Sequence, residues 1–297
     1  MYTGFAEVYD TLMNDVHYGA WADMYARMMT AYGIPRNAKV CECACGTGGL
    51  TLPLQQLGYE MMGIDLSQEM LWQAAQKARK AGFGIPFIRQ DMRQLRLHRP
   101  VDAVLATCDG VNYLLQDVDA AAFFQSAWEA IKPGGGLFFD VSTPYKLEHL
   151  LGSQFMGEDR RDVTYMWQNR YFPERQQVEM HLAIFVKEPD GRYRRIDEEQ
   201  VQRAYQAEKL VALLQSIGFV DVRVFGTNAL THPAPEEHRR HIAARFPDLL
   251  RLLFQRVHRA YRGAEAGVRL ETYSGFGVAR GIASAEAKSL HKHADTV

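Results

Sequence analysis

The stretch VCECACGTGG, residues 40–49, places three cysteines at alternate positions of an apolar segment that runs into a glycine-rich turn. Cys41, Cys43 and Cys45 share one face of the expected strand, with roughly 6–7 Å between successive members. Tetrahedral zinc sites usually draw ligand pairs from turns at C-x2–4-C spacing, and the sequence has no second Cys/His cluster to complete a site. Because cysteine is among the most buried residue types, we expect core packing here and no metal.

The other face of the segment carries Glu42, followed by Ala44, Gly46 and Gly48. A strand that ends in a glycine turn and opens a helix presents free N–H groups and lets its backbone approach a ligand closely. Ala44-x-Gly46-x-x-Gly49 also matches the dinucleotide pattern G-x-G-x-x-G, but only in degenerate form. A buried carboxylate such as Glu42 is costly beside a pyrophosphate and is paired beside an ammonium or sulfonium. The turn is therefore predicted to hold a cationic ligand.

The overall composition is that of an ordinary globular protein. The 297 residues are 47% hydrophobic and 23% charged, with a net charge of −1, which gives no general attraction to nucleic acid or anionic membrane. No apolar stretch approaches 18 residues, and the N-terminus lacks a basic start followed by an apolar run, so we expect neither a membrane span nor a signal peptide. Four cysteines in strand-like stretches indicate a reduced, cytoplasmic protein rather than a disulfide scaffold.

The hydrophobic periodicity changes along the chain. Short apolar runs alternate with helical patterns from about residue 38 to 142, which predicts a parallel sheet covered on both faces. Residues 161–204 are typical of three antiparallel strands with turns at FPER and EPDGR. Residues 236–262 show a long helical pattern rich in Arg and His, which we interpret first as a solvated face. LETYSGFGVARGI is expected to be the last strand, and the polar tail that follows is expected to be disordered.

Six stretches, in the correct order over about half of the chain, resemble the motifs of the class I S-adenosylmethionine (SAM) dependent methyltransferases. The acid, the CGTG turn and the next helix resemble the first motif, GIDLSQEML the second and IRQDM the third. AVLATCDGVNYL resembles the fourth strand and its exit, AIKPGGGLFFD the turn into strand five, and LLQSIGFVDVRVFG the last helix and strand six. FAEVYDTLMNDVHYGAW is similar to the N-terminal helix of small bacterial members that carry an antiparallel lid.

The resemblance implies an α/β fold with a Rossmann-like seven-stranded methyltransferase sheet, in the order 3-2-1-4-5-7-6 with strand 7 antiparallel, and an antiparallel β lid inserted after strand 5. The implied organisation is N-terminal helices closing over the cofactor (1–36), a SAM-binding core (37–145), the lid (146–205), the end of the core (206–283) with a helical insertion (231–266) that the small relatives lack, and a disordered tail (284–297).

The resemblance also implies roles for individual residues. Asp65 would accept both ribose hydroxyls, although it or Ser67 could instead cap the following helix. Asp91 would accept from the adenine amino group. The family's first glycine is Ala44 here, so we expect a slightly altered cofactor fit. The complete expected cofactor-binding set is Tyr9, Tyr18, Trp21, Glu42, Ala44, Gly46, Gly48, Asp65, Leu66, Met70, Asp91, Met92, Cys108 and Asp109. The N-terminal aromatics of this set could equally be helix-face core.

Catalysis is expected to rest on proximity and orientation, because SAM already carries an activated methyl group and leaves as S-adenosylhomocysteine. The partner is expected to be a small-molecule acceptor enclosed under the lid. Its nucleophilic atom could be O, N or C. Asn112, Tyr113 and Tyr165 are the candidates for orienting it. Tyr165 shares a strand face with Trp167, Asn169 and Tyr171, which faces either substrate or plain lid packing.

Three other functions compete with methyl transfer. An NAD(P)-dependent reductase would use the glycine-rich turn and leave Glu42 and Asp91 unexplained. A non-catalytic SAM-binding regulator would use residues 231–266 as a partner surface. An aminopropyl transferase would need an acidic cluster after strand four, where only Asp109 stands. A homodimer is left open, and a nucleic-acid partner is disfavoured by the net charge.

Overall fold

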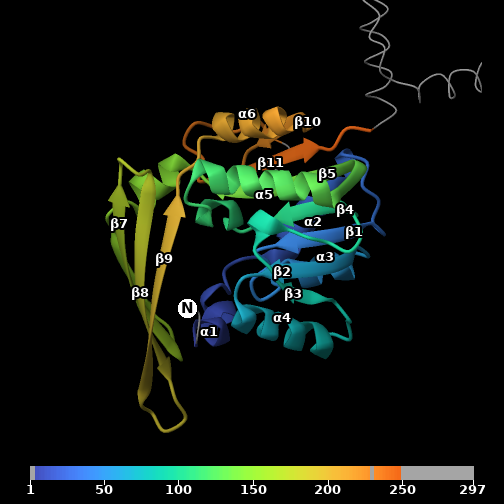
Figure 1. Cartoon of the computed structure of the whole chain (residues 1–297). Helices are drawn as coiled ribbons and strands as arrows, with labels where there is room; N and C mark the ends of the chain where they lie inside the picture. The colour runs from blue at the N-terminus through green and yellow to red at the C-terminus, as the bar shows by residue number, and fades with distance from the viewer. Residues whose placement is uncertain (1–3, 228–230, 249–297) are drawn as a thin grey trace, which may run out of the picture. The chain divides into compact units, whose positions relative to one another are not determined.

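A seven-stranded sheet forms the centre of the fold, in the order β10-β11-β5-β4-β1-β2-β3 (Figure 1). This computed structural model describes residues 4–227 and 231–248. Within that part the strand order, read from the other edge, is the predicted 3-2-1-4-5-7-6. The strands are β1 (Lys39–Cys43), β2 (Glu60–Asp65), β3 (Phe87–Arg89), β4 (Val101–Ala106), β5 (Ile131–Ser142), β10 (Val220–Phe225) and β11 (Arg239–Arg245).

Helices cover both faces of the sheet, as the strand–helix alternation predicts. Phe138 and Phe139 of β5 point to opposite faces, and each lies in a separate hydrophobic core. Phe138 packs with α2 and α3, and Phe139 packs with α5 and α6. The helices are α1 (Phe5–Leu12), α2 (Tyr18–Ala31), α3 (Thr51–Gln56), α4 (Gln68–Lys80), α5 (Asp117–Ala130) and α6 (Ala207–Ile217), with short turns η1 (Met92–Gln94), η2 (Gly110–Tyr113) and η3 (Lys146–Leu151). None of these helices is long and apolar enough to cross a membrane.

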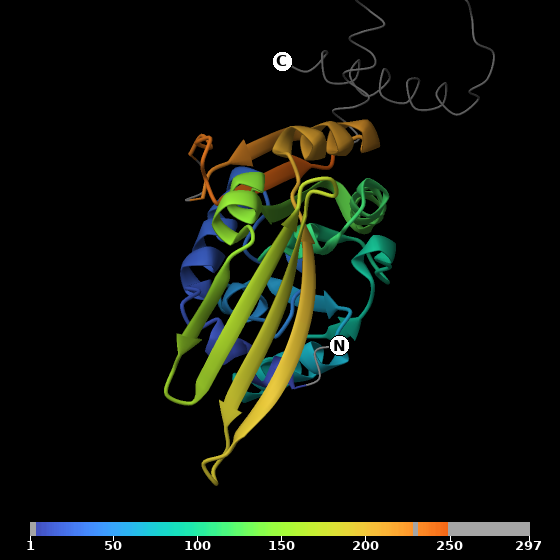
Figure 2. The ribbon, with the colours of Figure 1, turned by 90° about the vertical axis from the view of Figure 1, so that its left-hand side faces the viewer.

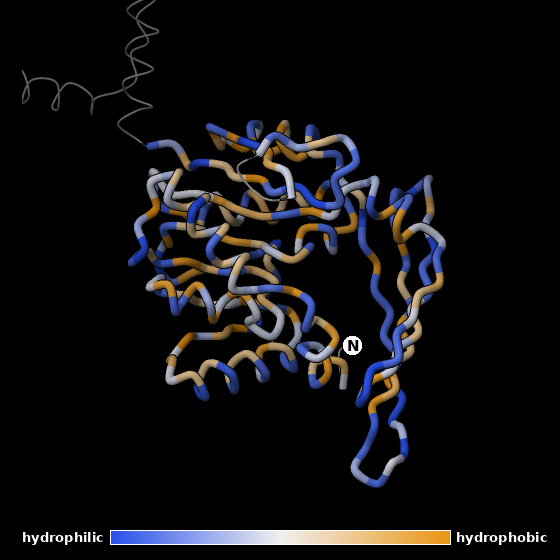
Figure 3. The backbone as a smooth tube through the Cα atoms, turned by 180° about the vertical axis from the view of Figure 1, so that it is seen from behind, coloured by the Kyte–Doolittle hydropathy of each residue, from blue (hydrophilic) through white to orange (hydrophobic). Residues whose placement is uncertain are grey.

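An antiparallel sheet of four strands follows β5 and forms the lid (Figure 2). The predicted three-stranded meander is confirmed, and a short exposed strand, β6, precedes it. The hydrophilic turn between β8 and β9 is visible at the end of this sheet (Figure 3). The strands are β6 (Phe155–Asp159), β7 (Val163–Phe172), β8 (Gln177–Lys187) and β9 (Tyr193–Arg203).

The N-terminal segment forms two helices, as expected. Phe5 and Val8 of α1 pack in one cluster with Met70 of α4 and with Ile184 and Ile196 of the lid. The apolar face of α1 is therefore buried between the core and the lid.

The helical pattern predicted for residues 236–262, and with it the helical insertion 231–266, is wrong over Arg239–Arg245. These residues form β11, which pairs antiparallel with both β5 and β10. The run from His241 to Ala244 is buried, because a strand inside a sheet covered on both faces is apolar on both sides. That tertiary setting overrides the helix propensity of its alanines. The remainder of the expected insertion (249–266), the strand expected in LETYSGFGVARGI and the tail 284–297 lie outside the described residues.

Candidate functional site

The glycine-rich turn after β1 adopts the backbone that its sequence predicts. Ala44, Gly46 and Gly48 have φ angles of 51°, 54° and 74°, in the left-handed region that favours glycine. The Gly46 N–H donates to Oδ2 of Asp65 at 2.8 Å, which joins the turn to the end of β2. A Cβ atom added at Gly46 would meet nothing within 4 Å. The backbone at Gly46 therefore borders open space into which a ligand could fit.

Glu42 lies beneath this turn and is only 2% exposed. Its carboxylate accepts hydrogen bonds from the hydroxyls of Thr51 in α3 and Thr107 after β4. Burial raises the pKa of Glu42 to about 7, although the two hydroxyl hydrogen bonds oppose the shift. The sequence predicted a buried acid, but gave no indication of its two threonine partners.

Asp65 connects the turn to α4. Its second oxygen, Oδ1, accepts from the Ser67 N–H at 2.9 Å, and Ser67 Oγ in turn accepts from the Met70 N–H at 3.2 Å. Ser67 is thus the helix cap, as one of the two alternatives predicted. Burial raises the pKa of Asp65, and the next side chain, Leu66, is 57% exposed.

Asp91 lies after β3, where its carboxylate is held by a neighbouring arginine. The guanidinium of Arg93 donates to it at 2.6 Å and also pairs with Asp119 at 2.8 Å. The hydrogen bond from Arg93 lowers the pKa of Asp91, despite the opposing effect of burial. Met92 is buried in the core, so of the two residues expected to contact the cofactor here only Asp91 offers a polar side chain.

Two of the predicted aromatics reach the site. The ring of Tyr18 lies against the turn, since a Cβ atom at Gly49 would be 2.7 Å from it. The hydroxyls of Tyr18 and Tyr9 lie near each other, since each affects the pKa of the other. Burial raises the pKa of Tyr9, and the nearby Tyr18 and Cys108 raise it further, which places Tyr9 between the turn and the exit of β4.

The exit of β4 is a strained turn. Cys108 and Asp109 have φ angles of 54° and 67°, which non-glycine residues rarely adopt. Their backbone N–H groups donate to the two carboxylate oxygens of Asp140 at 2.8 and 3.1 Å. Asp140 lies near the carboxyl end of β5 and is fully buried, so it fixes this backbone from beneath.

Arg239, the first residue of β11, supplies the counter-charge. Its guanidinium binds Asp140 and donates to both oxygens of Asp109, at 2.6 and 3.0 Å. Burial would raise the pKa of Asp109, but the positive charges of Arg239 and Lys146 outweigh it and hold the pKa at about 2. The predicted residue Trp21 belongs to this cluster, because Arg239 lies 5.0 Å over its ring. Asp140 and Arg239 were not predicted from the sequence, although Asp140 has the same pattern as Asp65, an acid that follows an apolar run.

The structure gives the candidate catalytic residues different settings. Asn112 donates to the carbonyls of Ser142 and Arg203 at 3.1 and 2.8 Å and is fully buried. Both its amide protons are used within the protein, which argues against its predicted role in orienting an acceptor. Tyr113 is 39% exposed, and its hydroxyl donates to Gln200 of β9 at 2.8 Å. Tyr165 donates to Glu158 on the neighbouring strand β6, while its ring packs beside α1.

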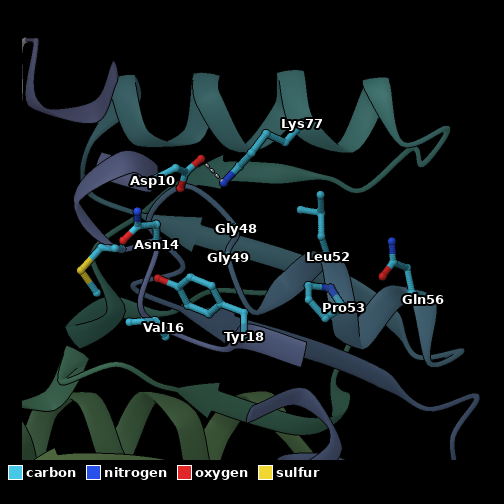
Figure 4. A pocket seen from close by; sticks show the side chains of 11 residues that line it. Asp10, Asn14, Val16, Tyr18, Gly48, Gly49, Leu52, Pro53, Gln56 and Lys77 are labelled. Carbon is cyan, nitrogen blue, oxygen red and sulfur yellow. Dashed lines mark hydrogen bonds and ion pairs between the residues drawn. The ribbon is translucent and has the colours of Figure 1, made fainter. Parts of the chain in front are cut away.

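A cavity of about 330 Å³ lies beside the turn, next to α3 and α4 (Figure 4). At its wall Asp10 accepts from the Thr47 hydroxyl and from Lys77, both at 2.6 Å. Of the predicted cofactor-binding residues it is lined by Tyr18 and Gly48 alone, so it is not the predicted cofactor site. The other lining residues are Asp10, Met13, Asn14, Val16, Gly49, Leu52, Pro53, Gln56 and Lys77. No group of three His, Cys, Asp or Glu residues that could hold a metal occurs in residues 4–227 and 231–248.

Comparisons with known proteins agree with this arrangement. A family model described as "Methyltransferase domain" matches residues 40–135. A protein of Geobacillus sp. (strain WCH70) is 32% identical over 236 residues, which are 80% of this chain and 95% of that protein. YqeM of Bacillus subtilis (strain 168) is 32% identical over 240 residues, 80% and 94% of the two chains. The names of both relatives say methyltransferase and specify no acceptor.

A solved structure extends the similarity to the lid. The crystal structure of a SAM-dependent methyltransferase from Clostridium acetobutylicum ATCC 824 matches with a TM-score of 0.74 and 28% identity, covering 83% of this chain and 99% of that one. The chain belongs to the class I SAM-dependent methyltransferases. It is an enzyme of this class, and its methyl donor is SAM.

Proposed function

We propose that this enzyme methylates a small molecule that is enclosed between the sheet of the core and the lid. The observation that carries the proposal is the hydrogen bond from Tyr113 to Gln200. Tyr113 follows the strained turn at Cys108 and Asp109, and Gln200 lies on the lid strand β9. The lid therefore meets the core at the exit of β4, where the resemblance puts the methionine part of SAM.

The residues around the glycine-rich turn fit SAM. Three carboxylates, those of Glu42, Asp65 and Asp109, lie at or just beyond the carboxyl ends of β1, β2 and β4. Asp65 accepts from the Gly46 N–H, where the backbone borders open space. Carboxylates suit a ligand that carries an ammonium, a sulfonium and ribose hydroxyls. When bound, SAM supplies a methyl group that is already activated on sulfur.

Residues in and around the turn would each contact a different part of SAM. Asp65 would accept from the ribose, exposed Leu66 would cover the adenine ring beside Asp91, and Cys108 and Asp109 would line the methionine part. Tyr9 would close this space from α1. The buried methionines, Met70 and Met92, and the backbone of Ala44, Gly46 and Gly48 would shape it, while Trp21 would act through Arg239.

The contribution of the protein to the reaction is to position the acceptor and to exclude water. Holding two reactants in line is worth up to about 7–11 kcal/mol in the most favourable cases. Phe5 and Val8 of α1 pack against Ile184 and Ile196 of the lid. The helix and the lid together form the part of the fold that is suited to excluding water. The need for a proton acceptor depends on the nucleophile, because a hydroxyl or carbon acceptor must lose a proton and a carboxylate has none to lose.

Calorimetric titration with SAM, S-adenosylhomocysteine and NADH tests the site. We expect micromolar binding of the two sulfur ligands, strongly weakened in Asp65→Ala and Glu42→Gln, and no binding of NADH. Binding of NADH without a response to SAM would contradict the assignment and favour a reductase. Turnover with a panel of small acceptors, followed as S-adenosylhomocysteine release, separates an enzyme from a SAM-binding regulator, which would show tight binding and no release.

A further inference from the structure

A lysine lies where the core meets the lid. Lys146 is the first residue of η3, shortly after the end of β5. Its backbone N–H donates to the Thr143 hydroxyl at 3.1 Å, and that hydroxyl donates to the carbonyl of Glu237 at 2.6 Å. The next residue, Leu147, is fully buried in a cluster with Val178 of the lid strand β8. The backbone of Lys146 is therefore fixed by contacts on both sides.

The ammonium group of Lys146 reaches the exit of β4. Its Nζ donates to Ser142 Oγ at 2.9 Å, and Ser142 Oγ donates to Oδ1 of Asp109 at 2.7 Å. The distance from Nζ to Oδ2 of Asp109 is 3.9 Å, which is too long for a hydrogen bond. Asp109 is the residue proposed above to line the methionine part of SAM. Lys146 therefore borders the part of the site where the methyl group would be transferred.

Lys146 has donors that the protein leaves unused. Arg239 already binds both oxygens of Asp109, so the fold does not need Lys146 to hold that carboxylate. An ammonium carries three donors, and within the described part of the chain Ser142 Oγ is the only atom that accepts from Nζ. The side chain of Lys146 remains 25% exposed. Its other two donors are therefore open to a bound molecule.

The charges around Lys146 favour an additional anion. Burial lowers the pKa of Lys146 and the nearby Arg239 lowers it further, although the carboxylates of Asp109 and Asp140 oppose the shift. These two carboxylates therefore compensate the ammonium only in part for the water that it loses. The two acids and the two bases of this cluster also cancel, whereas SAM brings two positive groups and one carboxylate. A further negative group would balance the enclosed site when SAM is bound.

We propose that Lys146 determines the specificity for the acceptor, and that the acceptor is a small molecule with an anionic group, a carboxylate or a phosphate, which pairs with the ammonium of Lys146. This assignment rests on the proposed function, because it names the class of molecule that the same site takes. The anionic group orients the acceptor and is a separate feature from the nucleophilic atom. Lys146 also discriminates against cationic acceptors, since like charges repel.

Three probes that share a benzene ring and differ in charge test the assignment: benzoate, phenyl phosphate and benzamide. Benzamide has nearly the shape of benzoate without its charge. Each probe is titrated by NMR into protein saturated with S-adenosylhomocysteine. We expect at least one of the two anions to bind about tenfold or more tightly than benzamide. Whichever anion binds more tightly tells whether the site takes a carboxylate or a phosphate.

Variants of two lysines connect the preference to the site. Lys146→Met should lose the preference and keep its affinity for S-adenosylhomocysteine, which reports an intact fold, and Lys146→Arg should keep the preference because it keeps the charge. The matched control is Lys132→Met. Lys132 lies at the opposite end of β5, where it pairs with Asp102 at 2.7 Å, and its removal should leave the preference unchanged.

Failure of the inference and failure of the proposed function have different signatures. Absence of binding by both anions, equal affinity for the three probes, or a preference that survives Lys146→Met would overturn the anion assignment while S-adenosylhomocysteine still binds. Wild-type protein that does not bind S-adenosylhomocysteine would overturn the proposed function itself.

Discussion

Glu42 titrates near neutral pH, and this has consequences of opposite sign for stability and for binding. A folded pKa of about 7 against an ordinary value of 4.5 means that the fold prefers the protonated acid. The resulting stability is fully present below the ordinary pKa and is lost as the pH rises through about 7, by roughly 3 kcal/mol. The ionised form, by contrast, is the one that attracts a cationic ligand.

Glu42→Gln should remove both effects. We expect wild-type protein to lose roughly 3 kcal/mol of unfolding free energy relative to Glu42→Gln between about pH 5 and about pH 8, measured by urea denaturation. Over the same interval SAM should bind wild-type protein more tightly as the pH rises, and bind the variant with no such trend. Parallel stability curves for the two proteins would show that Glu42 stays ionised in the fold.

Arg239 binds the carboxylates of Asp109 and Asp140, and its removal takes this guanidinium from both, leaving the more distant Lys146 beside Asp109. Arg239→Met should destabilise the protein by about 3–5 kcal/mol. The depressed pKa of Asp109, about 2, contributes stability that is present above its ordinary pKa and is lost as the pH falls, so the deficit of the variant should shrink in acid. The matched control is Arg240→Met. Arg240 makes a long contact, 3.5 Å, with the exposed Glu208, so this substitution should cost no more than about 1 kcal/mol. Equal losses in thermal unfolding would refute the role of Arg239.

The sequence identifies those site residues that sit in a local pattern and misses those that depend on distant pairing. Asp65 and Asp109 end apolar runs, and Ala44 and Gly46 stand in a turn motif, so each could be found from its neighbours. Arg239 reaches Asp109 across a separation of 130 residues, and no local pattern encodes such a contact.

At the scale of elements, the same limit explains β11. Its Arg- and His-rich sequence has no period that distinguishes an inserted strand from a helix, and only the slot between β5 and β10 decides the matter. The five parallel strands were predictable because each is followed by a helix of its own or a clear turn. β6 was missed because it is short and exposed, with little apolar alternation.

One contact should fasten α1 to the core. Asp10 of α1 binds both Thr47 in the turn and Lys77 of α4, while the carboxylate and ammonium remain 45% and 32% exposed. Lys77→Met should therefore change stability by less than about 1 kcal/mol but accelerate SAM dissociation several-fold, measured by stopped-flow fluorescence. The control Lys39→Met removes a similar exposed pair with Glu60 at the amino end of β1 and should leave dissociation unchanged. Equal dissociation rates in both variants would mean that α1 does not retain the ligand.

At the scale of the whole molecule, the ligand should stabilise core and lid together, because α1 contacts both. At 100 times its dissociation constant, S-adenosylhomocysteine adds about 2.7 kcal/mol, which corresponds to a rise of roughly 5–10 °C in Tm for a protein of this size. Asp65→Asn replaces one of the two acceptor oxygens of Asp65 with an NH2 donor, so it should show a much smaller rise, and NADH should produce none in either protein. If the ligand shifted the unfolding of the core while limited proteolysis of the lid stayed unchanged, α1 would not couple the two, and the enclosure on which the proposed reaction depends would have to come from the acceptor.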